Sequence, residues 1–170
     1  MGLFDKFKKK TVVEKDGTPK RVVVMEDKDT LYAPAPGKVV FLDAAPETGP
    51  LPEGAAGITI DPTAGAIWAP QTGNITFDVE HNELTIVNFM DVDVLVRLLP
   101  SAEDGTAQIK PLVEDGAHVH VGDPVATFDL AEGGPHLVLL VTNAEDFAGV
   151  QPATEEPVEV GDTLMLVLRK

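Results

Sequence analysis

Two stretches of the sequence share one pattern, and together they decide the fold. Residues 32–39 read Tyr-Ala-Pro-Ala-Pro-Gly-Lys-Val, and residues 68–75 read Trp-Ala-Pro-Gln-Thr-Gly-Asn-Ile. A second pair follows, because residues 121–125 read Val-Gly-Asp-Pro-Val and residues 160–164 read Val-Gly-Asp-Thr-Leu. In this second pattern glycine can take a positive φ angle and aspartate can bond back to nearby backbone, so we expect the same turn in two hairpins. The repeats predict a compact barrel of two related halves.

Around these repeats, short β-rich runs alternate with Gly, Pro, Asp and Asn, which is typical of a β-sandwich or barrel. Strict alternation in residues 74–79 places Ile75, Phe77 and Val79 on one face of a strand. The sequence therefore predicts an all-β, antiparallel sandwich or barrel with few short helices, one of them near Asn143, and a surface loop over 44–56. The predicted strands are residues 21–25, 38–42, 57–60, 74–79, 84–87, 93–99, 118–121, 124–128, 136–142 and 163–168.

Composition excludes several classes of function. The chain has 170 residues, which is enough for one domain with a substantial core. It has no cysteine, so disulfides, thiolate zinc sites, iron–sulfur clusters and cysteine nucleophiles are excluded. With 13 Lys and Arg against 28 Asp and Glu, the net charge is −15, and nucleic acid phosphates would be repelled.

The charge is unevenly distributed. Seven of the 13 cations lie in the first 21 residues beside three acids, so this part is about +4 and the rest about −19. We expect a flexible basic amphipathic arm over 1–20 and a single domain over 21–170. Leu3, Phe4 and Phe7 would share one side of a helix, so the arm is either an anionic-membrane contact or a disordered tail. No apolar run could cross a bilayer, so the expected location is the cytoplasm, with any membrane contact at the inner face.

Taken in chain order, the repeats and several further motifs resemble the glucose-specific IIA component of the bacterial phosphoenolpyruvate:sugar phosphotransferase system. The matching stretches are residues 1–6, 33–37, 57–62, 69–73, 113–130, 141–143 and 160–162. The resemblance implies an antiparallel β-sandwich of the duplicated hybrid-motif type. It also implies a carrier that takes a phosphoryl group from the histidine phosphocarrier protein and passes it to a sugar permease domain. We expect no cofactor and no metal.

In that family two histidines face each other, and one accepts the phosphoryl group while the other hydrogen-bonds it. The supporting histidine falls on His81. The acceptor position holds Arg97, whose guanidinium has no available lone pair and cannot be the nucleophile. Val79 replaces the usual threonine, and Leu99 and Ser101 replace the usual glycine and aspartate. The resemblance therefore predicts a retained fold in which histidine phosphorylation is lost or altered.

Three interpretations of this site stay open. In the first, the protein is a regulatory or docking module that binds phosphotransferase proteins or regulated transporters, with Arg97 at the centre of an apolar patch. In the second, His81 itself accepts the phosphoryl group and Arg97 clamps its oxygens. In the third, Arg97, in a strand flanked by Asp91 and Asp93 on an acidic body, is simply a solvated ion-pair partner. The residues of the predicted apolar patch are Phe77, Val79, Leu95, Leu98 and Leu99.

Other residues that could carry chemistry favour simpler interpretations. His118 and His120 would face one side of a strand and could bind a metal, but no third ligand other than an aspartate lies nearby, which favours a solvent-facing hairpin. Lys38 and Lys110 lie in no exposed hairpin tip of the kind that carries a lipoyl or biotinyl group. His136 opens an apolar strand, and the sequence assigns it no role.

Overall fold

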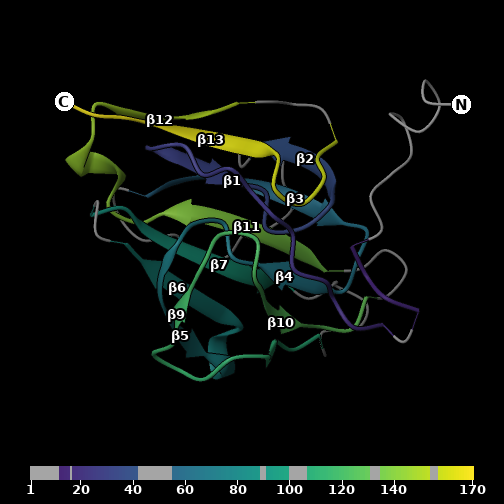
Figure 1. Cartoon of the computed structure of the whole chain (residues 1–170). Helices are drawn as coiled ribbons and strands as arrows, with labels where there is room; N and C mark the ends of the chain where they lie inside the picture. Colours follow the sequence, from purple (N-terminus) through teal and green to yellow (C-terminus); the bar gives the residue numbers. More distant parts are fainter. Residues whose placement is uncertain are drawn as a thin grey trace, which may run out of the picture.

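A computed structural model of the chain describes residues 12–15, 17–41, 55–88, 91–99, 107–130, 135–153 and 157–170, and these residues form β-strands and two short 3-10 helices (Figure 1). The strands are β1 (Thr30–Tyr32), β2 (Gly37–Phe41), β3 (Ala56–Pro62), β4 (Ala66–Trp68), β5 (Gly73–Asp78), β6 (Glu83–Val87), β7 (Asp93–Leu99), β8 (Lys110–Pro111), β9 (His118–Val119), β10 (Pro124–Thr127), β11 (His136–Val141), β12 (Gly149–Pro152) and β13 (Thr163–Leu168). The 3-10 helices are η2 (Val79–His81) and η3 (Ala144–Asp146).

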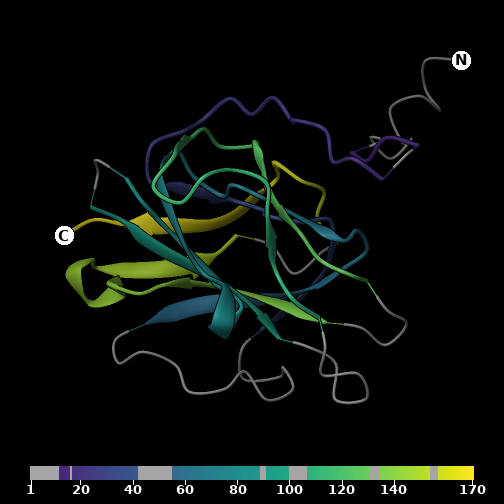
Figure 2. The ribbon, with the colours of Figure 1, turned by 90° about the horizontal axis from the view of Figure 1, so that it is seen from below.

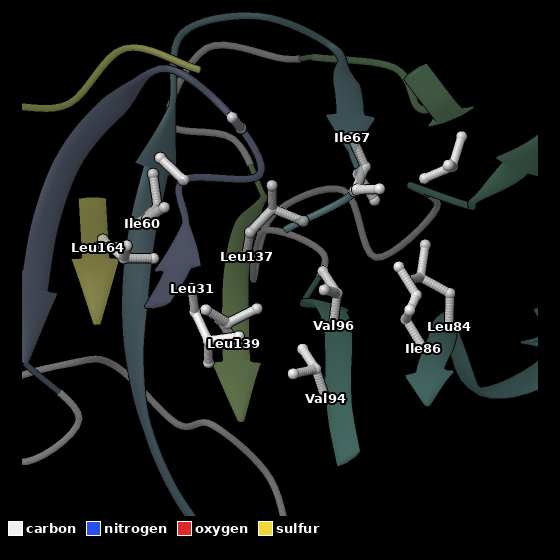
Figure 3. Close-up of a cluster of buried hydrophobic side chains, with 14 of the residues drawn as sticks. Leu31, Ile60, Ile67, Leu84, Ile86, Val94, Val96, Leu137, Leu139 and Leu164 are labelled. Atoms are coloured by element: carbon white, nitrogen blue, oxygen red, sulfur yellow. The ribbon is translucent and has the colours of Figure 1, made fainter. Parts of the chain in front are cut away.

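The strands form three antiparallel sheets. The largest has seven strands in the order β2-β3-β11-β7-β6-β5-β9, and two three-stranded sheets have the orders β1-β13-β12 and β4-β10-β8. Side chains from all three sheets meet in one apolar cluster, as Figure 3 shows for Leu31, Ile67 and Leu137 among others. The predicted all-β class is therefore confirmed. Among the described residues, no helix is long and apolar enough to span a membrane.

The two repeated units bind each other through their backbones. The N–H of Tyr32 donates to the carbonyl of Pro70 at 3.0 Å, and the N–H of Trp68 donates to the carbonyl of Pro34 at 2.7 Å. Each contact is the counterpart of the other, because Tyr32 and Trp68 occupy the same position in their units, as do Pro34 and Pro70. The two halves of the chain are thus joined by an approximately twofold exchange of hydrogen bonds.

The two Gly-Asp turns have the geometry that the sequence predicts. Gly122 and Gly161 have φ angles of 86° and 89°. The carboxylates of Asp123 and Asp162 each accept a hydrogen bond from the backbone N–H three residues earlier, at 2.9 and 2.8 Å. Glycine supplies the left-handed conformation without steric strain, and aspartate closes the turn.

Each turn is also joined to one repeated unit. The N–H of Ala33 donates to the carbonyl of Asp162 at 2.8 Å, and the N–H of Ala69 donates to the carbonyl of Asp123 at 2.9 Å. The unit at residues 32–39 therefore binds the turn at Gly161, and the unit at residues 68–75 binds the turn at Gly122. This crossed pairing connects residues that are far apart in the chain.

Residues 21–25 cross over both turns instead of forming the predicted strand. This segment is extended, but the structure assigns no strand to it. The N–H of Val22 donates to the carbonyl of Gly122 at 2.9 Å, and Val24 lies against Gly161. The alternate residues Val23 and Met25 are 87% and 92% exposed. Figure 2 shows this purple segment along one side of the molecule, so the prediction of a strand was wrong because its partners are turns and not another strand.

The described part of the predicted arm begins at Val12. Val12 is buried and packs with Trp68 and Val160 in a small apolar cluster. The indole Nε1 of Trp68 donates to the carbonyl of Lys20 at 2.7 Å. Residues 1–11 lie outside the described residues, and the division of the chain at residue 20 stays a prediction.

Most other predicted strands are confirmed within a few residues of their bounds. The sequence analysis missed β1, β4, β8 and β12, each of which has two to four residues. The predicted helix near Asn143 is η3, although the Asn143 side chain accepts from the N–H of Asp93 at 3.0 Å and does not cap the helix. The predicted loop over 44–56 lies outside the described residues except for residue 55 and Ala56, which begins β3.

The turn at Gly122 gives a test of the fold. A Cβ atom there would lie 2.0 Å from the backbone oxygen of Val22, whereas a Cβ at Gly116, with a φ angle of 88°, would meet nothing within 4 Å. Gly122→Ala is expected to lower the free energy of unfolding by about 3 kcal/mol or more. Gly116→Ala is the control and should lower it by about 1 to 2 kcal/mol, the penalty for the left-handed conformation alone. Urea unfolding measures both, and equal losses would contradict the packing of residues 21–25 on the turn.

Candidate functional site

His81 ends the 3-10 helix η2, directly after β5, and its ring is held by a carboxylate. The Asp78 side chain accepts from the backbone N–H of His81 at 3.3 Å and contacts ring atom Nδ1 at 2.8 Å. A carboxylate can only accept, so Nδ1 carries the proton and Nε2 holds the lone pair of the neutral ring. The His81 side chain is 69% exposed. The hydrogen bond and the charge of Asp78 raise the pKa of His81 above its ordinary value.

The turn that carries His81 is fixed by Asn82. Asn82 has a φ angle of 56°, a left-handed conformation that asparagine tolerates better than most residues. Its carbonyl accepts from the N–H of Leu98 at 2.8 Å, and its side chain bonds the backbone of Ala107 and Ile109 at 3.0 Å each. Asn82 therefore places His81 beside β7. The sequence analysis missed this positioning role, for which an asparagine directly after a helical turn was the available signal.

Arg97 is paired with Glu83 on the neighbouring strand. The two residues are opposite each other in the β6–β7 ladder. Arg97 Nε and Nη2 lie 2.9 and 2.8 Å from the same carboxylate oxygen of Glu83, and the two side chains are only 13% and 20% exposed. Arg97 is thus an ion-pair partner, as the third interpretation expects, although the pair is largely buried instead of solvated and its acid is Glu83 instead of a flanking aspartate. Asp93 lies four residues away on the same strand, whereas a directly opposite residue on one face is within side-chain reach.

The predicted apolar patch is not one exposed surface. Alternation along β7 turns Leu98 into the main core, where it is 1% exposed, so its predicted place in a docking patch was wrong. Leu95 is 9% exposed and packs with other buried residues, and Leu99 is partly buried against them. Phe77 packs partly buried against the main core. Of the five predicted patch residues, Val79 is the one with a large exposed fraction, 37%.

The opposite face of β7, which we call the outer face, carries Leu95, Arg97 and Leu99 and extends over the seven-stranded sheet. His136 on β11 is opposite Leu99 in the ladder and so lies on this face. Its Nδ1 contacts the carboxylate of Asp61 on β3. The outer face thus carries an imidazole held by an aspartate. It lies on β11, which neighbours β7 on the side away from β6.

The remaining histidines lie at the other end of the sheet, on or next to β9. The rings of His118 and His120 are 5.2 Å apart, so both side chains face the same side, as predicted. His118 Nδ1 lies 3.0 Å from the amide oxygen of Asn74. Within the described part of the chain, no three His, Cys, Asp or Glu side chains are grouped closely enough to hold a metal ion.

The arrangement of the sheets is also found in a solved structure. Among solved structures, the chain matches glucose permease IIA from Mycoplasma capricolum with a TM-score of 0.65 and 20% identity. The match covers 85% of this chain and 98% of that chain. The chain therefore has the glucose permease IIA fold.

The sequence comparison points to the same system. The PTS system beta-glucoside-specific EIIBCA component of Dickeya chrysanthemi is 27% identical over 144 residues, and the chain is a distant homologue of it. The match covers 80% of this chain and 23% of that protein, so the chain spans about a quarter of the length of this relative. No protein-family model matches the chain. The resemblance to phosphotransferase IIA components predicted from the sequence is confirmed.

The contact between His81 and Asp78 predicts a pH dependence. Because the pKa of His81 is raised above 6.5, the contact stabilises the fold below that pH and loses this effect as the pH rises through the raised pKa. Asp78→Asn should return the pKa of His81 toward 6.5, measured by proton NMR titration. Glu80→Gln is the control and should have the smaller effect, since Glu80 adds least to the rise. An unchanged pKa in Asp78→Asn would contradict the assigned contact.

Proposed function

We propose that the protein is a IIA-type component of the phosphotransferase system in which phosphorylation at the usual position is lost and which acts as a docking or regulatory protein. The observation that carries this proposal is the Arg97–Glu83 pair at the position where the family resemblance expects the acceptor histidine. A guanidinium offers no lone pair to phosphorus, and this one is neutralised by a carboxylate at 2.8 Å. The fold and the distant homology support the assignment to the phosphotransferase system. Arg97 at the acceptor position supports the altered role.

The proposed partners are the histidine phosphocarrier protein, the sugar permease domain or a regulated transporter. We place the protein in the cytoplasm, with residues 1–20 as a basic arm and residues 21–170 as the IIA-like domain. The arm carries the opposite charge to the acidic body, so its proposed target is an anionic membrane surface. No cofactor is part of the proposal.

The docking surface is centred on the turn that carries His81. Val79 is exposed there, and Asp78, Glu80 and His81 surround it with polar groups that are also exposed. An apolar side chain within a polar rim is the usual composition of a protein interface. Asn82 fixes this turn on β7, so a partner would meet a preformed surface.

Val79→Asp tests the docking surface. Placing a charge at the centre of the interface should weaken binding of the histidine phosphocarrier protein or of the permease domain at least tenfold, about 1.4 kcal/mol. Leu166→Asp is a matched control, because Leu166 on β13 is 39% exposed and Val79 is 37% exposed. Isothermal titration calorimetry measures both variants. Absence of binding by the unmodified protein, or equal weakening by both substitutions, would contradict the proposal.

A second candidate function is supported by the contact between His81 and Asp78. With Nδ1–H donated to Asp78, the neutral ring presents its lone pair at Nε2, which is the arrangement of an oriented nucleophile. In this alternative His81 takes the phosphoryl group from the phosphocarrier and passes it to the permease domain. The raised pKa acts against it, because more of the ring is protonated near neutral pH and has no lone pair.

Phosphorylation of the unmodified protein and of His81→Gln separates the two functions. The protein is incubated with phosphoenolpyruvate, enzyme I and the histidine phosphocarrier protein, and peptides are mapped under alkaline conditions that preserve phosphohistidine. The docking function expects no label on His81. Label on His81 that disappears in His81→Gln and passes on to the permease domain would establish the alternative instead.

A further inference from the structure

We propose that His136, to which the sequence assigned no role, is a phosphoryl acceptor that gives this docking protein a second, phosphorylated state. The site is the outer face of the sheet around His136, and the ligand class is an N-phosphorylated imidazole or another small phosphoryl donor. This inference rests on the proposed function in one respect, which is the identity of the phosphoryl donor in the cell.

Asp61 orients the ring of His136. The Asp61 carboxylate on β3 contacts Nδ1 of His136 on β11. Since a carboxylate accepts, the proton of the neutral ring is on Nδ1 and the lone pair is on Nε2. The two residues are next to each other across the β3–β11 ladder, one pair beyond Ile60 and Leu137, so the backbone fixes the contact. An oriented, neutral imidazole is the nucleophile that phosphoryl transfer needs.

A positively charged side chain lies on the same face, one step along the neighbouring strand. His136 is opposite Leu99 and Val138 is opposite Arg97, so His136 and Arg97 are diagonal neighbours across β7 and β11. Diagonal positions are roughly 7–8 Å apart at the backbone, which is within reach of an arginine side chain. A guanidinium has five N–H groups in a planar fork, so Arg97 can pair with Glu83 and still donate toward a phosphoryl oxygen within its reach.

A buried hydroxyl without a partner lies on the other side of His136. Thr59 on β3 is opposite Val138, so it is the second diagonal neighbour of His136 on the outer face. Thr59 is 0% exposed, and its Oγ1 has no hydrogen-bond partner, unlike every other buried side-chain oxygen or nitrogen among the described residues. A buried polar atom in this condition calls for an explanation, and an acceptor group brought in by a ligand is one.

The other histidines fit the role less well. The His136 side chain is 25% exposed, which admits a donor yet shelters the product from water, whereas His81 is 69% exposed. His118 and His120 lie on or beside β9 at the far edge of the sheet, away from Arg97. His136 is therefore the imidazole that combines a carboxylate at Nδ1, partial shelter and a nearby guanidinium.

The transfer step balances without any further reactant. The lone pair of His136 Nε2 forms a bond to phosphorus while the P–N bond of the donor imidazole breaks, and the donor leaves as a neutral imidazole with its own ring proton. The product ring of His136 keeps its proton on Nδ1 and becomes positively charged. Asp61 stabilises that charge. Thr59 and Arg97 are positioning groups for the phosphoryl oxygens.

The test uses the full chain with two phosphoryl donors. The first is the phosphorylated histidine phosphocarrier protein, regenerated by enzyme I and phosphoenolpyruvate. The second is potassium phosphoramidate, from which ammonia leaves and which needs no protein partner. Peptide mapping at alkaline pH locates the label. We expect label on His136 with both donors, and with phosphoramidate a rate at least fivefold above that of His118, the more exposed reference in the same molecule.

Asp61→Asn separates a chemical role from a structural one. It should slow labelling of His136 at least fivefold and leave the rate at His118 unchanged, because general loss of structure would change both rates. Failure of phosphoramidate to label His136 faster than His118 in the unmodified protein overturns the inference, while binding of the phosphocarrier would still support the docking function. Label on His136 from phosphoramidate in a protein that binds no phosphotransferase partner supports the acceptor site and contradicts the proposed function.

Discussion

The exchange of backbone hydrogen bonds between the two repeated units is the interaction on which the rest of the structure depends. Tyr32 binds Pro70 and Trp68 binds Pro34, so neither half can take its position without the other. The same units hold the Gly-Asp turns of opposite hairpins. In the part of the chain that the structure describes, the helical turns are short and several strands have two to four residues, so local stability is small and these long-range contacts must form together. The seven-stranded sheet that carries the site is built around these contacts.

On that sheet the site consists of three side-chain pairs, each of which includes a carboxylate. Arg97 and Glu83 neutralise each other at the centre, and an aspartate-held imidazole lies on either side of β7. Pairing explains how charged groups persist on a partly buried face, since an unpaired charge there would be strongly destabilising. The pairing also distinguishes the three groups. Arg97 is paired with Glu83, whereas in His81 and His136 the aspartate contacts Nδ1 and not Nε2.

The repeats were sufficient to predict the two Gly-Asp turns, because their glycine and aspartate residues favour the geometry that the structure contains. The sequence also singled out His81 and Arg97, each of which the structure pairs with a carboxylate. It could not identify Glu83 as the partner of Arg97 or Asp61 as the partner of His136, since ladder register between distant strands is set by the whole sheet and not by local pattern. Leu98 was misassigned to the surface for a related reason, because an unbroken apolar run does not say which residues face inward.

The Arg97–Glu83 pair also limits what a single substitution at position 97 could achieve. A histidine at position 97 would lie opposite the Glu83 carboxylate, which would favour the protonated ring, as Asp78 does at His81. A single substitution at position 97 would therefore place a histidine there whose neutral, nucleophilic form is disfavoured. An acceptor at position 97 would need a change at Glu83 as well. The ladder thus couples these two positions, so the chemistry of either one depends on the residue at the other.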